Sequence, residues 1–281
     1  MGRGVYIACV SFVSMGRKES LKKIFVDIKS VKIQGATDIA KAAVRAWRLS
    51  PGKATARKLL SLRPTEPMLS HVVQLLEKGV SEAEVLGHFY SAQKKMNTEI
   101  EKLLRGRKKL VVMTHCHSTN VLKGLLALHK KKKFFVVNTE TRPLYQGRKT
   151  ARELGNAGVK VETFVDSAMV QAVEKADVIL FGADALLRKG VVNKIGSRAL
   201  AELAAAHKKP VYVVADSWKF APRGVRLEER DFHEVWKKAP KNVIVRNPAF
   251  GFIPKKLVKG VISELGKKSL DGFVKAVGRR K

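Results

Sequence analysis

Residues 109–120, KLVVMTHCHSTN, decide the fold class of this chain. The apolar first half predicts a buried β-strand over residues 110–114. The polar second half is typical of the turn between a strand and the helix that follows it, which is where open α/β sheets bind their ligands. We therefore expect a functional site at Cys116, in the middle of this turn.

The same change from an apolar run to a helical pattern repeats along the rest of the chain. This alternation predicts a mostly parallel sheet with right-handed crossovers, a Rossmann-like layer, in an α/β protein. Helices are expected at residues 119–129, 146–157, 168–175 and 195–208. Strands are expected at 110–114, 134–138, 159–165, 178–182, 211–215 and 243–246, with a weaker one at 258–264.

Residues 16–105 carry helical periods and almost no strand signal. The longest pattern, 81–104, opens with Ser81-x-x-Glu84, a capping box. We expect a helical N-terminal domain of about four or five helices, followed by the α/β domain at 106–281. Residues 1–15 are interpreted as a loose extension or an over-called start, since Met15 is a second plausible initiator; a weak signal peptide is the alternative.

Composition restricts the class of protein. The 56 Lys and Arg against 24 Asp and Glu give a formal net charge of +32. A positive field attracts phosphorylated metabolites or nucleic acid, although a general basic bias of the surface explains it equally. Nucleic acid is only weakly suggested, because no basic stripe is interleaved with aromatics. Two cysteines, Cys9 and Cys116, favour a reducing cytoplasm, and no apolar run approaches the roughly 20 residues that span a bilayer.

The ends of the predicted strands carry the candidate chemistry. Cys116 is either a small buried hydrophobe or, at a helix N-terminus beside His115 and His117, a thiolate of lowered pKa. A metal held by these three neighbours is not expected, because adjacent residues at a strand end point in opposite directions. Asp184 ends another apolar run, so poor solvation is expected to raise its pKa towards acid chemistry.

Several basic or glycine positions are candidates for holding phosphate, each with a structural alternative. Gly35 either caps a helix or lets backbone N–H groups approach an anion. Arg63 either pairs with Glu66 or offers its guanidinium fork to a phosphate. Lys194 is expected beside the N-terminus of a helix, and Lys219 is a further candidate. In the loop after the second strand, Glu140 and Arg142 are expected to form an ion pair.

Taken in order, eight short segments resemble one family. They are QGA at 34–36, RPT at 63–65, THCHS at 114–118, ETRP at 140–143, GADA at 182–185, NKIG at 193–196, KF at 219–220 and NPAF at 247–250. From about residue 20 to 266 the chain resembles the α, β and δ regulatory subunits of initiation factor 2B and the related sugar-phosphate isomerases. Within that family it looks most like the archaeal ribose-1,5-bisphosphate isomerase branch.

The resemblance implies roles for individual residues. Cys116 and Asp184 match the acid/base pair of the isomerases, which need no metal or other cofactor. The resemblance also implies a homo-oligomer, either a dimer or a hexamer. Two positions depart from the bisphosphate isomerases, since Gln34 stands in place of Arg and Thr37 in place of Gly. The residues matching sugar-phosphate contacts are Gln34, Gly35, Ala36, Arg63, Ser118, Thr119, Arg142, Asn193, Lys194 and Lys219.

Three hypotheses for function follow. The first is an aldose–ketose isomerase that converts ribose 1,5-bisphosphate into ribulose 1,5-bisphosphate, with Asp184 protonating the ring oxygen and the Cys116 thiolate removing the proton from C2. The second is a non-catalytic factor 2B-like subunit that binds phosphorylated ligands or an initiation factor, which the Gln34 departure favours. The third and weakest is RNA binding driven by charge alone.

Overall fold

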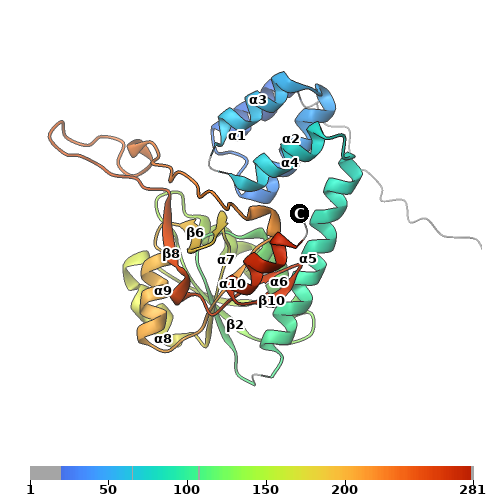
Figure 1. Cartoon of the computed structure of the whole chain (residues 1–281). Coiled ribbons are helices and arrows are strands. Elements are labelled where there is room, and N and C mark those ends of the chain that lie inside the picture. Colours follow the sequence, from blue (N-terminus) through green and yellow to red (C-terminus); the bar gives the residue numbers. More distant parts are fainter. Residues whose placement is uncertain (1–19, 65, 107, 280–281) are drawn as a thin grey trace, which may run out of the picture.

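The computed structural model describes residues 20–64, 66–106 and 108–279, so the predicted extension at 1–15 lies outside the described residues. The chain begins with a group of helices and continues as an α/β sheet region (Figure 1). The α/β class with a helical N-terminal part is therefore confirmed. The first helices are α1 (Leu21–Lys29), α2 (Ala36–Leu49), α3 (Lys53–Leu62), α4 (Pro67–Glu77) and α5 (Glu82–Leu104).

Helix α5 connects the two regions rather than belonging to the first alone. Its N-terminus has the predicted capping box, in which the Glu84 amide donates to Ser81 Oγ at 3.2 Å and the Ser81 amide donates to the Glu84 carboxylate at 3.0 Å. Phe89 packs with the α2 and α4 core, whereas Met96 and Ile100 pack with the sheet core. The change from one core to the other thus comes within α5, upstream of the expected boundary at residues 105–106.

The main sheet has the order β10-β9-β7-β4-β1-β2-β3 and is parallel except for β10. The chain builds β1 to β3 outward in one direction and then returns to place β4 on the other side of β1. The topological switch point therefore lies between β1 and β4, where α/β proteins bind ligands. The strands are β1 (Val111–Thr114), β2 (Phe135–Thr139), β3 (Lys160–Phe164), β4 (Val178–Phe181), β7 (Val211–Val214), β9 (Gly260–Ser263) and β10 (Gly266–Lys268).

Both faces of this sheet are covered, which explains the continuous apolar runs. Met113 of β1 faces one core and Val112 the other, and both are fully buried. Strands buried on both faces have no polar alternation, as expected for a parallel sheet. The covering helices are α6 (Thr119–His129), α7 (Gln146–Asn156), α8 (Met169–Lys175), α9 (Ser197–Ala206) and α10 (Leu270–Gly278).

A second, antiparallel sheet was not expected. It consists of β5 (Ala185–Leu187), β6 (Gly190–Lys194) and β8 (Phe250–Pro254). Asn193 and Lys194 therefore lie in a strand, and the helix predicted over 195–208 begins at Ser197. Only three residues pair in β5, too few for a recognisable pattern.

The strand predicted at 243–246 was wrong. These residues lie in the long segment between β7 and β8, which projects from the sheet region as an arm (orange in Figure 1). Ile244 is 86% exposed, because no neighbouring strand pairs with this apolar run. Local β propensity without a partner does not make a strand.

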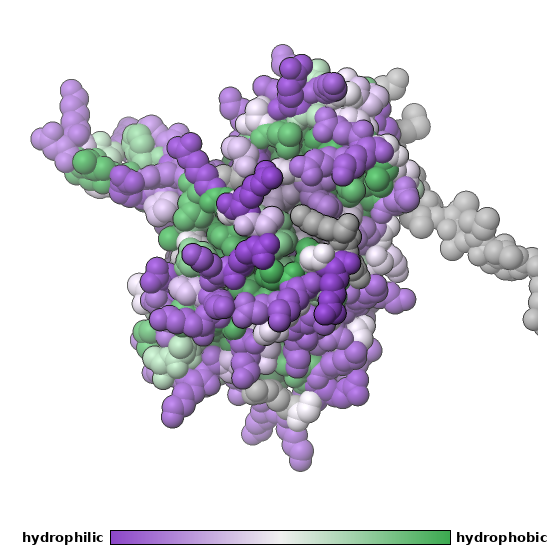
Figure 2. All heavy atoms as spheres, in the orientation of Figure 1, coloured by the Kyte–Doolittle hydropathy of each residue, from purple (hydrophilic) through white to green (hydrophobic). Residues whose placement is uncertain are grey.

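Hydrophilic side chains are spread over most of the face in Figure 2, on the helical group and the sheet region alike. On this face the hydrophilic residues are therefore not confined to one element. Within the described residues, none of the helices combines the length and apolar character needed to cross a bilayer.

Candidate functional site

One cavity lies between the helical group and the carboxyl ends of β1 and β4, with about 810 Å³ of empty space including its open mouth. Cys116 and Asp184 both line it. So do all but one of the predicted ligand contacts, the exception being Arg142. Those that line the cavity are Gln34, Gly35, Ala36, Arg63, Ser118, Thr119, Asn193, Lys194 and Lys219.

Arg142 serves a different purpose from the one expected. Its guanidinium donates to the Tyr145 hydroxyl at 2.8 Å and to the Val235 carbonyl at 3.1 Å, so it ties the β2–α7 loop to the arm. The predicted ion pair between Glu140 and Arg142 was also wrong. Glu140 accepts instead from Arg148 Nε at 3.1 Å, and Arg148 lies in the first turn of α7.

The backbone holds Cys116 firmly in the cavity wall. The residue has a left-handed φ of 65°, its amide donates to Thr141 Oγ1 at 3.0 Å, and its carbonyl accepts from Thr150 Oγ1 at 2.9 Å. Burial, followed by the charge of Asp184, raises the pKa of the Cys116 thiol to about 12. Of the two states considered for Cys116, burial thus favours the thiol over the thiolate in the free protein.

The flanking histidines do not provide the positive charge that the thiolate alternative needs. His115 is buried, with Nδ1 2.6 Å from Thr139 Oγ1 and Nε2 2.8 Å from the Ile195 carbonyl, and burial lowers its pKa. His117 lies with Nδ1 3.0 Å from Thr150 Oγ1, and burial followed by the nearby Lys149 lowers its pKa to about 4. Both rings are neutral at pH 7 and supply no positive charge to stabilise a thiolate.

Asp184 follows β4 as predicted. Its amide donates to the Val192 carbonyl at 2.9 Å, which fixes the residue at the start of the β5–β6 hairpin. Burial raises the pKa of its carboxyl, against the opposing charges of Lys219 and Arg63. The direction is the one expected for a group that delivers a proton near neutral pH.

Two helix N-termini supply uncharged donors to the same cavity. Gly35 is the N-cap of α2, with φ 83° and no side-chain cap, and Ala36 and Thr37 line the cavity beside it. The first N–H groups of a helix have no acceptor within the helix and attract anions. Gly35 thus caps the helix as expected, and its role in anion binding stays a prediction. Ser118 caps α6 and its hydroxyl accepts from the Val121 amide at 3.4 Å.

A row of buried charges on the opposite wall was only partly predicted. The Arg63 guanidinium lies 3.6 Å from Glu66 and 3.5 Å from Glu228, and Glu228 accepts from Arg230 Nε at 3.1 Å. Arg63 therefore both pairs with Glu66 and lines the cavity. Arg230 was missed, because it lies between predicted strands in a stretch without periodicity. Among the described residues, Arg63 Nε, Glu66 Oε2 and Arg230 Nη1 are buried without a hydrogen-bond partner.

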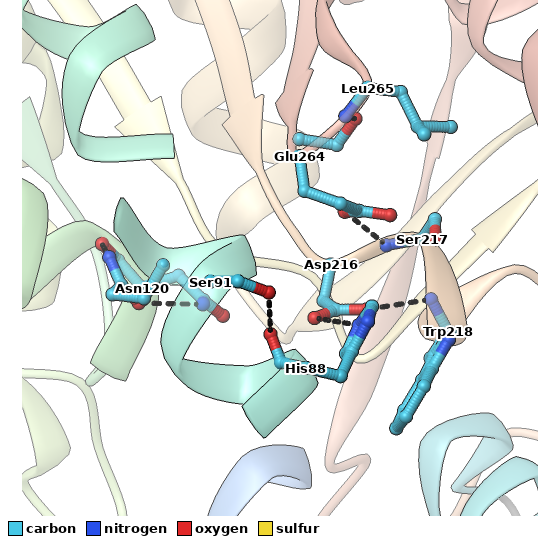
Figure 3. Close-up of polar contacts among 10 residues, drawn as sticks. His88, Ser91, Asn120, Asp216, Ser217, Trp218, Glu264 and Leu265 are labelled. Atoms are coloured by element: carbon cyan, nitrogen blue, oxygen red, sulfur yellow. Dashed lines mark hydrogen bonds and ion pairs between the residues drawn. The ribbon is translucent and has the colours of Figure 1, made fainter. Parts of the chain in front are cut away.

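A second group of titratable residues lies outside the cavity and was not predicted. His88, Asp216 and Glu264 bring possible metal-ligand atoms within 4.8 Å of one another. The Asp216 carboxylate is already engaged by His88 Nε2 at 2.9 Å and by the Trp218 amide at 2.9 Å (Figure 3). The His88 ring also stacks on Trp218 with 3.6 Å between centroids. We call His88, Asp216 and Trp218 the clasp, because they join α5 to the segment after β7.

Fold and site together define an α/β protein with a cavity at its switch point, lined by a thiol, a carboxyl and several cations. Residues 53–269 match the model of the initiation factor 2 subunit family, and the chain belongs to this family. It is 31% identical to ribose 1,5-bisphosphate isomerase of Archaeoglobus fulgidus, over 74% of this chain and 76% of that protein.

Two solved structures superpose closely on this chain. The translation initiation factor eIF-2B of Pyrococcus horikoshii superposes with a TM-score of 0.79 at 28% identity, covering 89% of this chain and 96% of that one. The 5-methylthioribose 1-phosphate isomerase of the same organism also gives a TM-score of 0.79, at 23% identity over 93% of this chain and 88% of that one. At that identity the second likeness shows the fold alone.

Proposed function

We propose that the protein is an aldose–ketose isomerase acting on a ribose that carries a 1-phosphate, and that it converts ribose 1,5-bisphosphate into ribulose 1,5-bisphosphate. The observation that supports this most is that Cys116 and Asp184 line one cavity together with several cations. The named activity of the Archaeoglobus fulgidus relative supports the choice of substrate.

Ring opening is the first chemical requirement, because the anomeric phosphate locks the sugar as a ring. Asp184 donates its proton to the ring oxygen as the bond between C1 and that oxygen breaks. Cys116, deprotonated, removes the proton from C2, and the electrons of that C–H bond form the double bond between C1 and C2. The raised pKa of Asp184 suits this step, because it keeps the acid protonated at higher pH than an ordinary carboxyl.

Proton return completes the cycle. The C2 hydroxyl of the enol gives its proton to the Asp184 carboxylate, and Cys116 returns its proton to C1. The product is a 2-ketose with its phosphates in place, and both side chains regain their starting protonation states. Counted from the deprotonated sulfur, every proton is accounted for by these two residues and the sugar, so the isomerisation steps require no metal, nucleotide or redox cofactor.

The protonated sulfur of the free protein sets a condition on this scheme. With a pKa of about 12, Cys116 must lose its proton before it accepts one from C2. Lys194 and Arg230 are the two cations whose charges favour the thiolate, against burial and Asp184. Lys194 and Arg230 would therefore stabilise the thiolate in addition to binding the phosphates.

A non-catalytic, ligand-binding subunit is the second candidate. The same high pKa of Cys116 favours it, because a ligand-binding protein does not need a thiolate. The named function of the Pyrococcus horikoshii structure also favours it. The predicted homo-oligomer suits either candidate.

A turnover assay separates the two candidates. Purified protein is incubated with ribose 1-phosphate, ribose 1,5-bisphosphate and methylthioribose 1-phosphate, and the ketose product is measured. We expect turnover of the bisphosphate, and none above background with Cys116→Ser. A wild-type protein that binds these sugars without converting any of them, and that co-purifies with an initiation factor, would establish the second candidate instead.

A further inference from the structure

Arg230 lines the cavity, and its side chain is only 9% exposed. Its Nε donates to Glu228, but Nη1 is buried without a hydrogen-bond partner in the described parts of the chain. A buried donor left unpaired costs about 1–3 kcal/mol, more when it is charged. An orphaned guanidinium facing a cavity therefore indicates that an anionic ligand completes it.

Backbone pairing fixes Arg230 at the base of the arm. Its amide donates to the Asn247 carbonyl at 2.9 Å, and the Ala249 amide donates to the Glu228 carbonyl at 2.9 Å. The two segments thus form a short antiparallel ladder next to β8, with an isolated bridge between Glu229 and Pro248. Arg230 is consequently held by regular hydrogen bonding, as a preorganised binding residue should be.

The charge balance around Arg230 leaves room for an anion. Glu228 is shared by two guanidinium groups, those of Arg63 and Arg230. Glu66, the other acidic neighbour of Arg63, has its pKa raised to about 7 by burial and then by Asp184, so near neutrality it is partly protonated. Within ion-pair distance, the two buried guanidinium groups are therefore matched by Glu228 and a partly protonated Glu66. A phosphate supplies the missing negative charge.

This position is separate from the N-terminus of α2, the other anion-binding feature of the cavity. Gly35 and its neighbours belong to the helical group, whereas Arg230 belongs to the sheet region. Arg230 also lies close to Lys194. Burial lowers the pKa of Lys194, Cys116 opposes this shift, and the charge of Arg230 lowers the pKa further. Two anion-binding features on different elements suit a ligand that carries two phosphates.

We propose that Arg230 binds the second phosphate of the ligand and so selects a sugar bisphosphate over a monophosphate. This inference rests on the proposed function for the identity of the sugar. It adds a specificity residue to that function, and its test separates binding from turnover.

The test uses Arg230→Gln, with Arg223→Gln as the matched control, because Arg223 is an exposed arginine of the same segment. Dissociation constants for ribose 1,5-bisphosphate and ribose 1-phosphate are measured by calorimetry, together with kcat/KM. A charged hydrogen bond of typical strength predicts about 10- to 100-fold weaker binding of the bisphosphate by Arg230→Gln. The monophosphate should change less than about threefold by the same reasoning, and the control should match wild type with both ligands.

The outcomes distinguish this inference from the proposed function. Selective loss of bisphosphate binding without turnover in wild type would support the role of Arg230 and end the isomerase proposal. Equal loss of both ligands, or of neither, in a folded Arg230→Gln protein would overturn the role of Arg230 whatever the turnover. Should that variant not fold, Arg230→Lys decides, since lysine keeps the charge but not the two-pronged donor geometry. Wild-type selectivity in Arg230→Lys overturns the inference, and reduced selectivity for the bisphosphate supports it.

Discussion

The cavity and the clasp both bury carboxyl groups, but they differ in where those groups find partners. In the clasp, both oxygens of Asp216 lie within 3.0 Å of His88 Nε2, and one of them also accepts from the Trp218 amide. In the cavity, Glu66 Oε2 and Arg230 Nη1 are buried without partners among the described residues. The groups of the clasp find their partners within the protein, whereas the cavity keeps buried polar atoms without a partner, as the proposed ligand site requires.

This difference separates a structural cluster from a binding site. Buried polar groups are nearly always hydrogen-bonded, so exceptions need an explanation. Both clusters contain a histidine or cysteine and carboxylates, and residue types alone would rank them equally. The unpaired atoms of the cavity are what assign function to it. Removing a residue should therefore affect catalysis or ligand binding in the cavity and stability in the clasp.

The largest expected effect is on catalysis by Asp184→Asn. Removing the proton donor should lower kcat by about 10²- to 10⁴-fold, the usual contribution of general acid–base catalysis. The unfolding temperature should stay the same or rise, because a buried carboxyl is replaced by a neutral amide of the same shape. Turnover and thermal unfolding are measured on one preparation, with Glu162→Gln, an exposed partner of Lys175, as the control. A loss of kcat accompanied by unfolding would place Asp184 with the structural residues instead.

A smaller effect concerns the pH dependence of stability and Glu66, which is 2% exposed. Burial, followed by Asp184, raises its pKa from 4.5 to about 7. Between these values the folded protein holds a proton that the unfolded chain releases, so wild-type stability falls as pH rises through this range. At about 1.4 kcal/mol per pKa unit the fall amounts to about 3 kcal/mol.

Glu66→Gln removes the titrating carboxyl and tests whether wild-type stability falls or rises with pH. The free energy of unfolding of the variant, relative to wild type, should increase by about 3 kcal/mol between pH 4.5 and 8. Urea unfolding at several pH values measures it. Glu101→Gln is the control, because Glu101 forms an exposed pair with Lys131, and such pairs contribute little. A Glu66→Gln variant that becomes relatively less stable as pH rises would show that Glu66 is held as a carboxylate.

The sequence was sufficient for the sheet and for the two strand ends that meet in the cavity. The apolar run before Cys116 and the one before Asp184 belong to neighbouring strands, because β1 and β4 flank the switch point. Strands buried on both faces have a strong local signal. The order of the motifs also identified the family, and residues 53–269 match its model.

The features that the sequence did not predict depend on contacts between segments that lie far apart in the chain. The thiolate prediction for Cys116 assumed charged histidines, but His115 and His117 are neutral because residues about 25 to 80 positions away bury and bond them. Arg230 reaches the cavity from a loop without periodicity. The clasp joins residues 88 and 216, whose spacing carries no recognisable pattern. The roles assigned to the site residues remain proposals that the experiments above address.

The smallest expected effect is on stability, and it concerns the clasp. His88→Ala leaves the buried Asp216 carboxylate without its imidazole and removes the stacked contact with Trp218. We expect a loss of about 1–3 kcal/mol in the free energy of unfolding, the cost of an unpaired buried acceptor. Activity at saturating substrate should change little, because neither His88 nor Asp216 lines the cavity.

A double-mutant cycle that combines His88→Ala with Asp216→Asn measures the interaction between the imidazole and the carboxylate, separately from the other effects of each substitution. If the imidazole and carboxylate stabilise each other, the double variant should lose less than the sum of the two single variants, by at least about 0.5 kcal/mol. Additive losses would mean that the two groups act independently, and the contrast with the cavity would then rest on the unpaired atoms alone. Urea unfolding of the four proteins gives the coupling directly. The kcat of each shows whether the junction between α5 and the segment after β7 also holds Lys219, the residue that follows the stacked tryptophan, in place for the ligand.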